Sequence, residues 1–98
     1  MHIFHITDQS TWSAAKNSPE YLGGTLSTDG FIHCCFPGQI EDVLKKWFEG
    51  KENLILLELD PDIISSPIKY ENLEGGEELF PHVYGPINTA SVFSEKLI

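Results

Sequence analysis

The stretch Leu54-Ile55-Leu56-Leu57-Glu58-Leu59 (LILLEL) is apolar at every position except Glu58. Successive side chains of a β-strand point to opposite faces, so an extended segment that is apolar on both faces has to be covered on both. The stretch therefore predicts a central strand, with helix on one side and loop or sheet on the other. The turn residues Asp60-Pro61-Asp62 end it.

Further strands are predicted on either side of this segment along the chain. Near the end of the chain, Val92 alternates with Ser91 and Phe93 with Ser94, which is typical of a strand lying beside an earlier one. The turn residues Asp29-Gly30 begin a short strand, and Pro37-Gly38 ends it. The predicted strands outside the central one cover residues 1–7, 31–35, 68–72 and 90–97.

A helix is predicted over residues 40–48, because its apolar side chains follow the spacing i, i+3, i+4, i+7, i+8. These side chains are those of Ile40, Val43, Leu44, Trp47 and Phe48. We expect this helix to pack into the core. A shorter helix follows the N-cap candidates Thr7, Asp8 and Ser10 and ends before Pro19, and residues 20–28 are expected to form a loop.

The order of these elements predicts the fold class. Five strands with two helices, both in the first half of the chain and not alternating strand by strand, indicate an α+β domain. We expect a mixed or mostly antiparallel sheet. Because 98 residues are one domain's worth of chain, residues 1–98 are predicted to form a single domain.

The charge of the chain argues against nucleic acid as a partner. The net charge is −9, with six lysines and no arginine against fifteen carboxylates. Affinity for nucleic acid comes largely from neutralised phosphates, and arginine supplies the bidentate contacts to phosphates and guanine. We therefore expect a small-molecule ligand rather than DNA or RNA, and a monomer or weak dimer.

The chain has no segment suited to a membrane, since its longest apolar run, residues 54–57, is far shorter than the about 20 residues needed to cross one. The only cysteines, Cys34 and Cys35, are adjacent, and a disulfide between neighbours on opposite faces would be strained. Free thiols suit a reducing compartment, so a cytoplasmic location is expected.

Three of the four histidines lie in or beside segments bounded by glycine, proline or other turn residues: His5, His33 and His82. A buried imidazole without a hydrogen-bond partner would cost about 1–3 kcal/mol, so each ring needs a partner. If the strands that carry His5 and His33 are adjacent, the two rings can face one cleft. Satisfied core histidines and a shared polar site both remain open at this point.

The run Phe80-Pro81-His82-Val83-Tyr84-Gly85-Pro86 (FPHVYGP) is held extended by its two prolines. His82 and Tyr84 then project to the same side, as a preorganised binding edge requires. The alternative is a stiff turn whose aromatic rings fill the core. Glu71, in the preceding predicted strand, is a candidate acid, base or acceptor for a ribose hydroxyl, or else an exposed strand carboxylate.

Metal and thiol chemistry are weaker interpretations of the same residues. The chain has no HxH, HExxH or CxxC pattern, so a zinc site would need His5, His33 and His82 to converge with a carboxylate. A nucleophilic triad would join Cys35 with a histidine and Asp29, but nothing in the sequence lowers the thiol pKa. We expect no metal site.

Several motifs in this order resemble a small bacterial family known as domain of unknown function 952 (DUF952). They are the opening strand ending in HIT, Trp12, DGFIHC, Gln39, LILLELD, the pair Tyr70-Glu71, and FPHVYGP. The resemblance spans nearly the whole chain. It implies an ADP-ribosyltransferase-like fold, in which a small split sheet encloses a dinucleotide cleft, and it brings no established activity.

The resemblance also implies roles for single residues. His5 is similar to the ribose-binding histidine of ADP-ribosyltransferases, and Cys35 stands where the wider family usually has a serine. The glutamate that stabilises a ribosyl cation in those enzymes has no sure match, and Glu71, His82 and Tyr84 are candidates for that place.

These observations predict a histidine-lined cleft that binds NAD or a related nucleotide and cleaves or transfers at the ribosyl bond. An NAD-like nucleotide is the one ligand or cofactor that the resemblance suggests. The alternative is a non-catalytic module for small-molecule binding or interaction. The candidate catalytic residues are His5, His33 and Glu71, and the candidate ligand-binding residues are His5, Thr7, His33, His82 and Tyr84.

Overall fold

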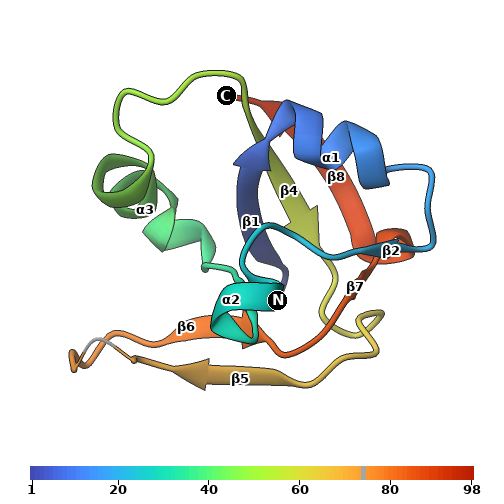
Figure 1. Cartoon of the computed structure of the whole chain (residues 1–98). Helices are drawn as coiled ribbons and strands as arrows, with labels where there is room; N and C mark the ends of the chain where they lie inside the picture. The colour runs from blue at the N-terminus through green and yellow to red at the C-terminus, as the bar shows by residue number, and fades with distance from the viewer. Residues whose placement is uncertain (74) are drawn as a thin grey trace.

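The computed structural model describes residues 1–73 and 75–98. Its largest sheet has the order β1-β4-β8, and all its pairings are antiparallel. These strands are β1 (Ile3–Asp8), β4 (Leu54–Leu59) and β8 (Val92–Leu97). The LILLEL stretch is thus the central strand that its apolar pattern predicts, with the two ends of the chain paired to its edges (Figure 1).

A second sheet has the order β3-β6-β5 and is also antiparallel. Its strands are β3 (Ile32–His33), β6 (Phe80–Val83) and β5 (Ile68–Glu71). In Figure 1, β5 and β6 run below the first sheet. A third pairing joins β2 (Glu20–Tyr21) to β7 (Ile87–Asn88).

The first two sheets are linked where Phe4 meets Cys35. The amide of Phe4 donates to the carbonyl of Cys35 at 2.8 Å, and the amide of Cys35 donates back at 2.7 Å. This isolated bridge brings β1 against the segment that follows β3. His5 follows Phe4, and His33 lies two residues before Cys35. The bridge between the sheets therefore also positions these two histidines.

The helices are α1 (Gln9–Ala15), α2 (Leu26–Asp29) and α3 (Ile40–Trp47), and short 3-10 turns lie at Pro37–Gln39 and Thr89–Ser91. Asp8 caps α1 by accepting from the amide of Thr11 at 2.9 Å. Gly30 ends α2 in the left-handed region, at φ +81°, where glycine is favoured because it has no Cβ.

The sequence-based segmentation needs two corrections. The described residues form eight strands rather than five. β2 and β7 are two-residue pairings with no readable period, and β6 lies in the FPHVYGP run, which was interpreted as an extended edge or a stiff turn and not counted as a strand. The predicted loop at residues 20–28 contains β2 and most of α2. The α+β class and the antiparallel pairing are confirmed.

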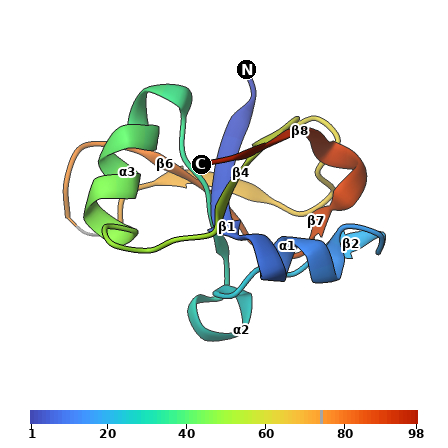
Figure 2. The ribbon, with the colours of Figure 1, turned by 90° about the horizontal axis from the view of Figure 1, so that it is seen from above.

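The prediction that α3 packs into the core is wrong, since none of its residues is buried and Trp47 is 55% exposed. Periodicity identifies which side of a helix is apolar but not what covers that side. Figure 2 shows α3 and α1 on opposite sides of β1. The core instead gathers between the sheets and α1, around residues that include Ile3, Trp12, Tyr21, Ile32, Leu57, Leu59, Val83 and Ile87.

None of the helices in the described part of the chain is long and apolar enough to cross a membrane.

Candidate functional site

An open cleft of about 910 Å³ lies between α3 and the strands β1, β3 and β6. Four of the predicted site residues line it: His5, Thr7, His33 and His82. Its volume is at the upper end of the range of small-molecule sites, about 300–1,000 Å³. The strand pairing has therefore brought together three imidazoles that are distant in the sequence.

His5 is buried in the wall of this cleft and uses both of its ring nitrogens. Its Nδ1 donates to the backbone carbonyl of His33 at 2.6 Å, and its Nε2 accepts from the hydroxyl of Tyr21 at 2.7 Å. Because burial disfavours the charged ring, the pKa of His5 falls to about 4. His5 is therefore neutral near pH 7, with its proton on Nδ1, and ties β1 to β2 and β3.

His82, on β6, is backed by a carboxylate. Its Nδ1 lies 3.0 Å from Oε1 of Glu71 on β5, and the hydroxyl of Tyr84 donates to the same oxygen. Hydrogen bonds from Tyr84 and then His82 lower the pKa of Glu71, and the carboxylate raises the pKa of Tyr84. Glu71 and Tyr84 do not line the cleft and reach it only through His82.

His33 is the cross-strand partner of His82 and has a carboxylate of its own. Its Nε2 lies 2.9 Å from Oδ2 of Asp29, at the end of α2. The His33 and His82 rings meet edge to face with centroids 5.5 Å apart. Phe31 stacks on His82 at 4.2 Å and leans on His33 at 4.6 Å, which holds both rings in place.

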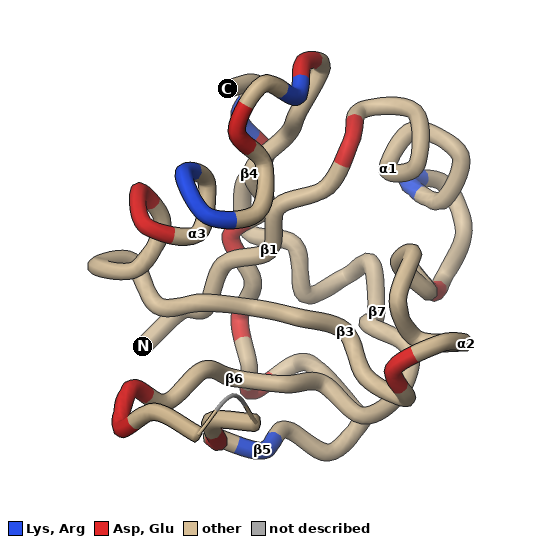
Figure 3. The backbone as a smooth tube through the Cα atoms, turned by 60° about the vertical axis from the view of Figure 1, so that its left-hand side comes forward, with Lys and Arg blue, Asp and Glu red and all other residues tan. Residues whose placement is uncertain are grey.

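The opposite wall of the cleft comes from α3 and the segment after it. Val43, Trp47 and Phe48 contribute apolar surface there, so the stripe expected in the core borders the cleft instead. The amine of Lys51 lies over the ring of Phe48, 5.5 Å from its centroid. Figure 3 shows that the acidic residues are spread along the chain, while a pair of lysine positions marks α3.

Cys34 and Cys35 also line the cleft as free, buried thiols. Burial raises the pKa of Cys35 to about 11 and that of Cys34 further still. Both thiols therefore remain protonated near pH 7, whereas a nucleophilic cysteine reacts as the thiolate. The burial of Cys35 and the raised pKa of its thiol therefore argue against the triad built on it.

Within the described residues, no three or more His, Cys, Asp or Glu side chains are grouped so that they could hold a metal ion. His5 would in any case have to give up one of its two hydrogen bonds to bind a metal.

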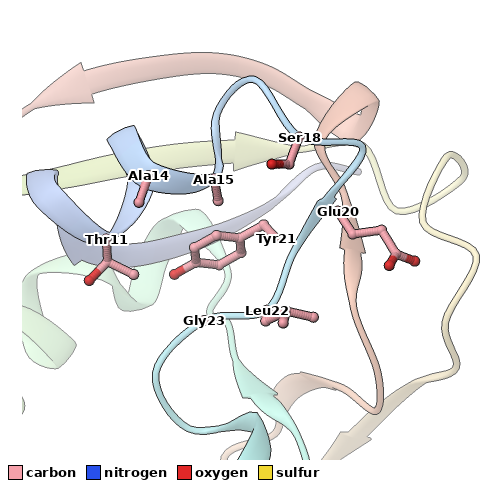
Figure 4. Close-up of a pocket in the computed structure, with 8 residues that line it drawn as sticks. All are labelled: Thr11, Ala14, Ala15, Ser18, Glu20, Tyr21, Leu22 and Gly23. Carbon is pink, nitrogen blue, oxygen red and sulfur yellow. The ribbon is translucent and has the colours of Figure 1, made fainter.

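A smaller hollow of about 280 Å³ lies between α1 and the segment that contains β2. Figure 4 shows Thr11, Ala14 and the ring of Tyr21 around it, with the carboxylate of Glu20 pointing away. Most of its lining side chains are small or apolar, and the one carboxylate among them points away, so this hollow offers little chemistry.

Sequence reasoning missed several residues of the site. Tyr21 fell within the loop predicted for residues 20–28, and no pattern links it to His5, which precedes it by 16 residues. Asp29 was considered only with Cys35, although its spacing of four from His33 was a readable signal. Trp47 and Phe48 were assigned to the core.

The chain matches a family model described as "Protein of unknown function (DUF952)" over residues 6–95. It is similar to the crystal structure of protein CC0527 from Caulobacter crescentus, with 32% identity, a TM-score of 0.86, and coverage of 98% of this chain and 84% of that chain. The solution NMR structure of CC0527 gives 33% identity, a TM-score of 0.77, and coverage of 97% and 82%. No curated protein matches the chain.

Proposed function

This chain belongs to the DUF952 family, whose function is unknown, and from that premise we propose that its cleft binds NAD or a related nucleotide and acts at the ribosyl bond. The main observation in support of this proposal is that one cleft of about 910 Å³ is lined by His5, Thr7, His33 and His82. Two small antiparallel sheets linked beside this cleft are compatible with an ADP-ribosyltransferase-like architecture, which we include in the proposal.

Each part of a nucleotide has a suitable neighbour in the cleft. The exposed ring of Trp47 and the ring of Phe48 offer flat apolar faces on which a base can stack. Thr7, His33 and His82 supply hydrogen-bonding groups for ribose hydroxyls. The positive charge of Lys51 suits a phosphate, although the chain has no arginine, the residue that usually binds phosphate through bidentate hydrogen bonds.

The roles expected for single residues change with the geometry. His5 is a positioning residue, because both of its nitrogens are bonded within the protein. Glu71 does not face the ligand, so Asp29, which lines the cleft, is the carboxylate placed to stabilise positive charge on a ribosyl group. Glu71 and Tyr84 act through His82.

Incubation with NAD tests the proposal, with nicotinamide release followed by chromatography and binding followed by thermal melting. We expect NAD to raise the melting temperature and to be cleaved. His33→Ala, on an exposed ring, should abolish the cleavage. His2→Ala is the matched control, because His2 bonds to Glu58 at 2.6 Å and does not line the cleft. If millimolar NAD causes neither a melting shift nor release of nicotinamide, the proposal is wrong.

The satisfied hydrogen bonds of His5 favour a second candidate, a non-catalytic module that binds a small molecule. Such a module needs the cleft and its aromatic wall but no proton transfer. It would show a rise in melting temperature with NAD and no release of nicotinamide.

A further inference from the structure

Two carboxylate–imidazole pairs stand side by side on neighbouring strands, and simple ligand binding does not require them. Asp29 bonds to His33 on β3, and Glu71 bonds to His82 on β6. The two histidines are directly opposite each other in the β3–β6 register. Each imidazole thus has one nitrogen committed to a carboxylate.

The carboxylates determine which nitrogen of each ring is left for a ligand. An ionised carboxylate only accepts hydrogen bonds, so the neutral His82 ring carries its proton on Nδ1 and the neutral His33 ring carries its proton on Nε2. The remaining atoms are Nε2 of His82 and Nδ1 of His33. Neither is bonded to a described residue. The His33 side chain is 53% exposed. His82 is buried in the cleft wall, but its Nε2 is not completely enclosed, since no fully buried side-chain nitrogen of an unexposed residue in residues 1–73 and 75–98 lacks a partner.

We propose that His33 and His82 are a general acid–base pair and that the substrate is a nucleotide whose leaving base departs only when protonated, such as an adenine nucleotide. This inference rests on the proposed function and narrows its substrate class. Nicotinamide leaves NAD as a neutral molecule and needs no proton. Adenine leaving a ribosyl carbon does need one, and a second imidazole supplies it.

The proton transfers balance without any further reactant. Water adds to C1′ of the ribosyl group and gives a proton to the neutral imidazole. The C1′–N bond breaks, its electron pair stays on the leaving base, and the protonated imidazole donates its proton there. After the reaction, the ring that was neutral is protonated and the ring that was protonated is neutral. Proton exchange with solvent at the exposed His33 restores the starting state.

The two rings are close enough to act on one ribosyl unit, since their centroids are 5.5 Å apart. Phe31 covers a face of His82, which leaves the ring edge for the substrate. Glu71 is a positioning residue in this arrangement, and Tyr84 holds the Glu71 carboxylate in place. Asp29 positions His33 through its hydrogen bond, in addition to the charge-stabilising role proposed for it above.

The experiment measures adenine release from AMP and nicotinamide release from NAD with the same enzyme preparations. We expect His33→Ala and His82→Gln each to slow adenine release at least about 100-fold, as loss of a general acid or base does. Only the ring that accepts the water proton is needed for NAD. Since His33→Ala is expected to abolish NAD cleavage, that ring is His33, and His82→Gln should retain nicotinamide release. His2→Ala should leave both reactions unchanged.

A second measurement does not depend on turnover. The ring ¹⁵N shifts of the unmodified protein report which nitrogen of each imidazole carries the proton. In the neutral form of each ring we expect Nδ1–H at His82 and Nε2–H at His33, and Glu71→Ala should mix the two neutral tautomers at His82 while leaving that of His33 unchanged.

The outcomes separate the two proposals. Nicotinamide release without adenine release overturns the acid–base pair and leaves the proposed function standing. The opposite tautomer at either ring overturns the pair whatever the turnover. Absence of both products and of any melting shift with AMP or NAD overturns both proposals.

Discussion

The Nε2 atom of His5 and the hydroxyl of Tyr21 lie 2.7 Å apart, which joins β1 to β2, 16 residues later in the chain. The same imidazole reaches the carbonyl of His33 through Nδ1. One side chain thus holds three segments at the back of the cleft. Both ring nitrogens of His5 are hydrogen-bonded within the protein, so His33 and His82 are the imidazoles that can contact a ligand.

Tyr21→Phe should reduce the free energy of unfolding by about 1–3 kcal/mol, because it leaves a buried ring nitrogen of His5 without a partner. Urea unfolding measures the loss. Tyr70→Phe is the matched control, since Tyr70 is 49% exposed, and it should change the free energy of unfolding by less than about 0.5 kcal/mol. Equal losses in the two variants would contradict the role given to the His5–Tyr21 contact.

The free energy of unfolding should fall as the pH drops from 6.5 towards 4, because of His5. Its pKa is about 4 in the folded protein against 6.5 for a free ring, so in this window the unfolded chain binds the extra proton. Stability therefore rises with pH here, and the full effect is about 3 kcal/mol.

Urea unfolding at several pH values measures this slope. The lowered pKa values of Glu58, Glu71 and Glu95 act in the same direction but below about pH 4.5. His5→Gln should flatten the slope above that pH. A slope that persists unchanged in His5→Gln would show that another group is responsible.

Truncation of the two tryptophans should lower the free energy of unfolding to very different extents. Trp12 is 3% exposed and packs edge-on against Tyr21, so Trp12→Ala should cost about 3–5 kcal/mol of unfolding free energy. Trp47 is 55% exposed and lines the cleft, so Trp47→Ala should cost less than about 1 kcal/mol.

Binding should show the reverse order for the same pair. Trp47→Ala removes a stacking surface, and we expect it to reduce the melting shift caused by NAD. Thermal melting with and without NAD measures the difference. If Trp47→Ala unfolded the protein as easily as Trp12→Ala, α3 would belong to the core after all.

The sequence revealed those parts of the fold that depend on local pattern. The apolar run at β4 predicted a central strand, and the helical spacing at α3 predicted a helix. The exposure of α3 could not be predicted, because the strands that face its apolar side across the cleft are distant in the chain. The two-residue strands β2 and β7 are too short for any period to appear.

The candidate site divides in the same way. His5, His33 and His82 were identifiable because each stands among apolar strand residues, where an imidazole is conspicuous. The different roles of the three histidines could not be identified, because they depend on which ring nitrogen bonds to Tyr21, Asp29 or Glu71. Those contacts are made by pairing between strands, and a single sequence carries no direct signal of strand register.

Gly85→Ala should destabilise the protein through two separable effects. Gly85 has φ +150°, a conformation that residues with a Cβ rarely adopt, and this strain costs about 1–3 kcal/mol. A Cβ would also lie 2.5 Å from Oγ of Ser66, which is held by its hydrogen bond to the carbonyl of Pro86 at 2.7 Å. Urea unfolding measures the total loss.

A second variant and a control separate these contributions. Gly85→Ala combined with Ser66→Gly removes the clash but keeps the strained φ, so it should recover only part of the loss, measured against Ser66→Gly alone. Gly24→Ala is the control, because a Cβ there meets nothing within 4 Å and the backbone is not in the positive-φ region. Since Tyr84 precedes Gly85 and donates to Glu71, the clash should also loosen the support of His82. Unchanged stability in Gly85→Ala would mean that the FPHVYGP segment adopts another backbone path.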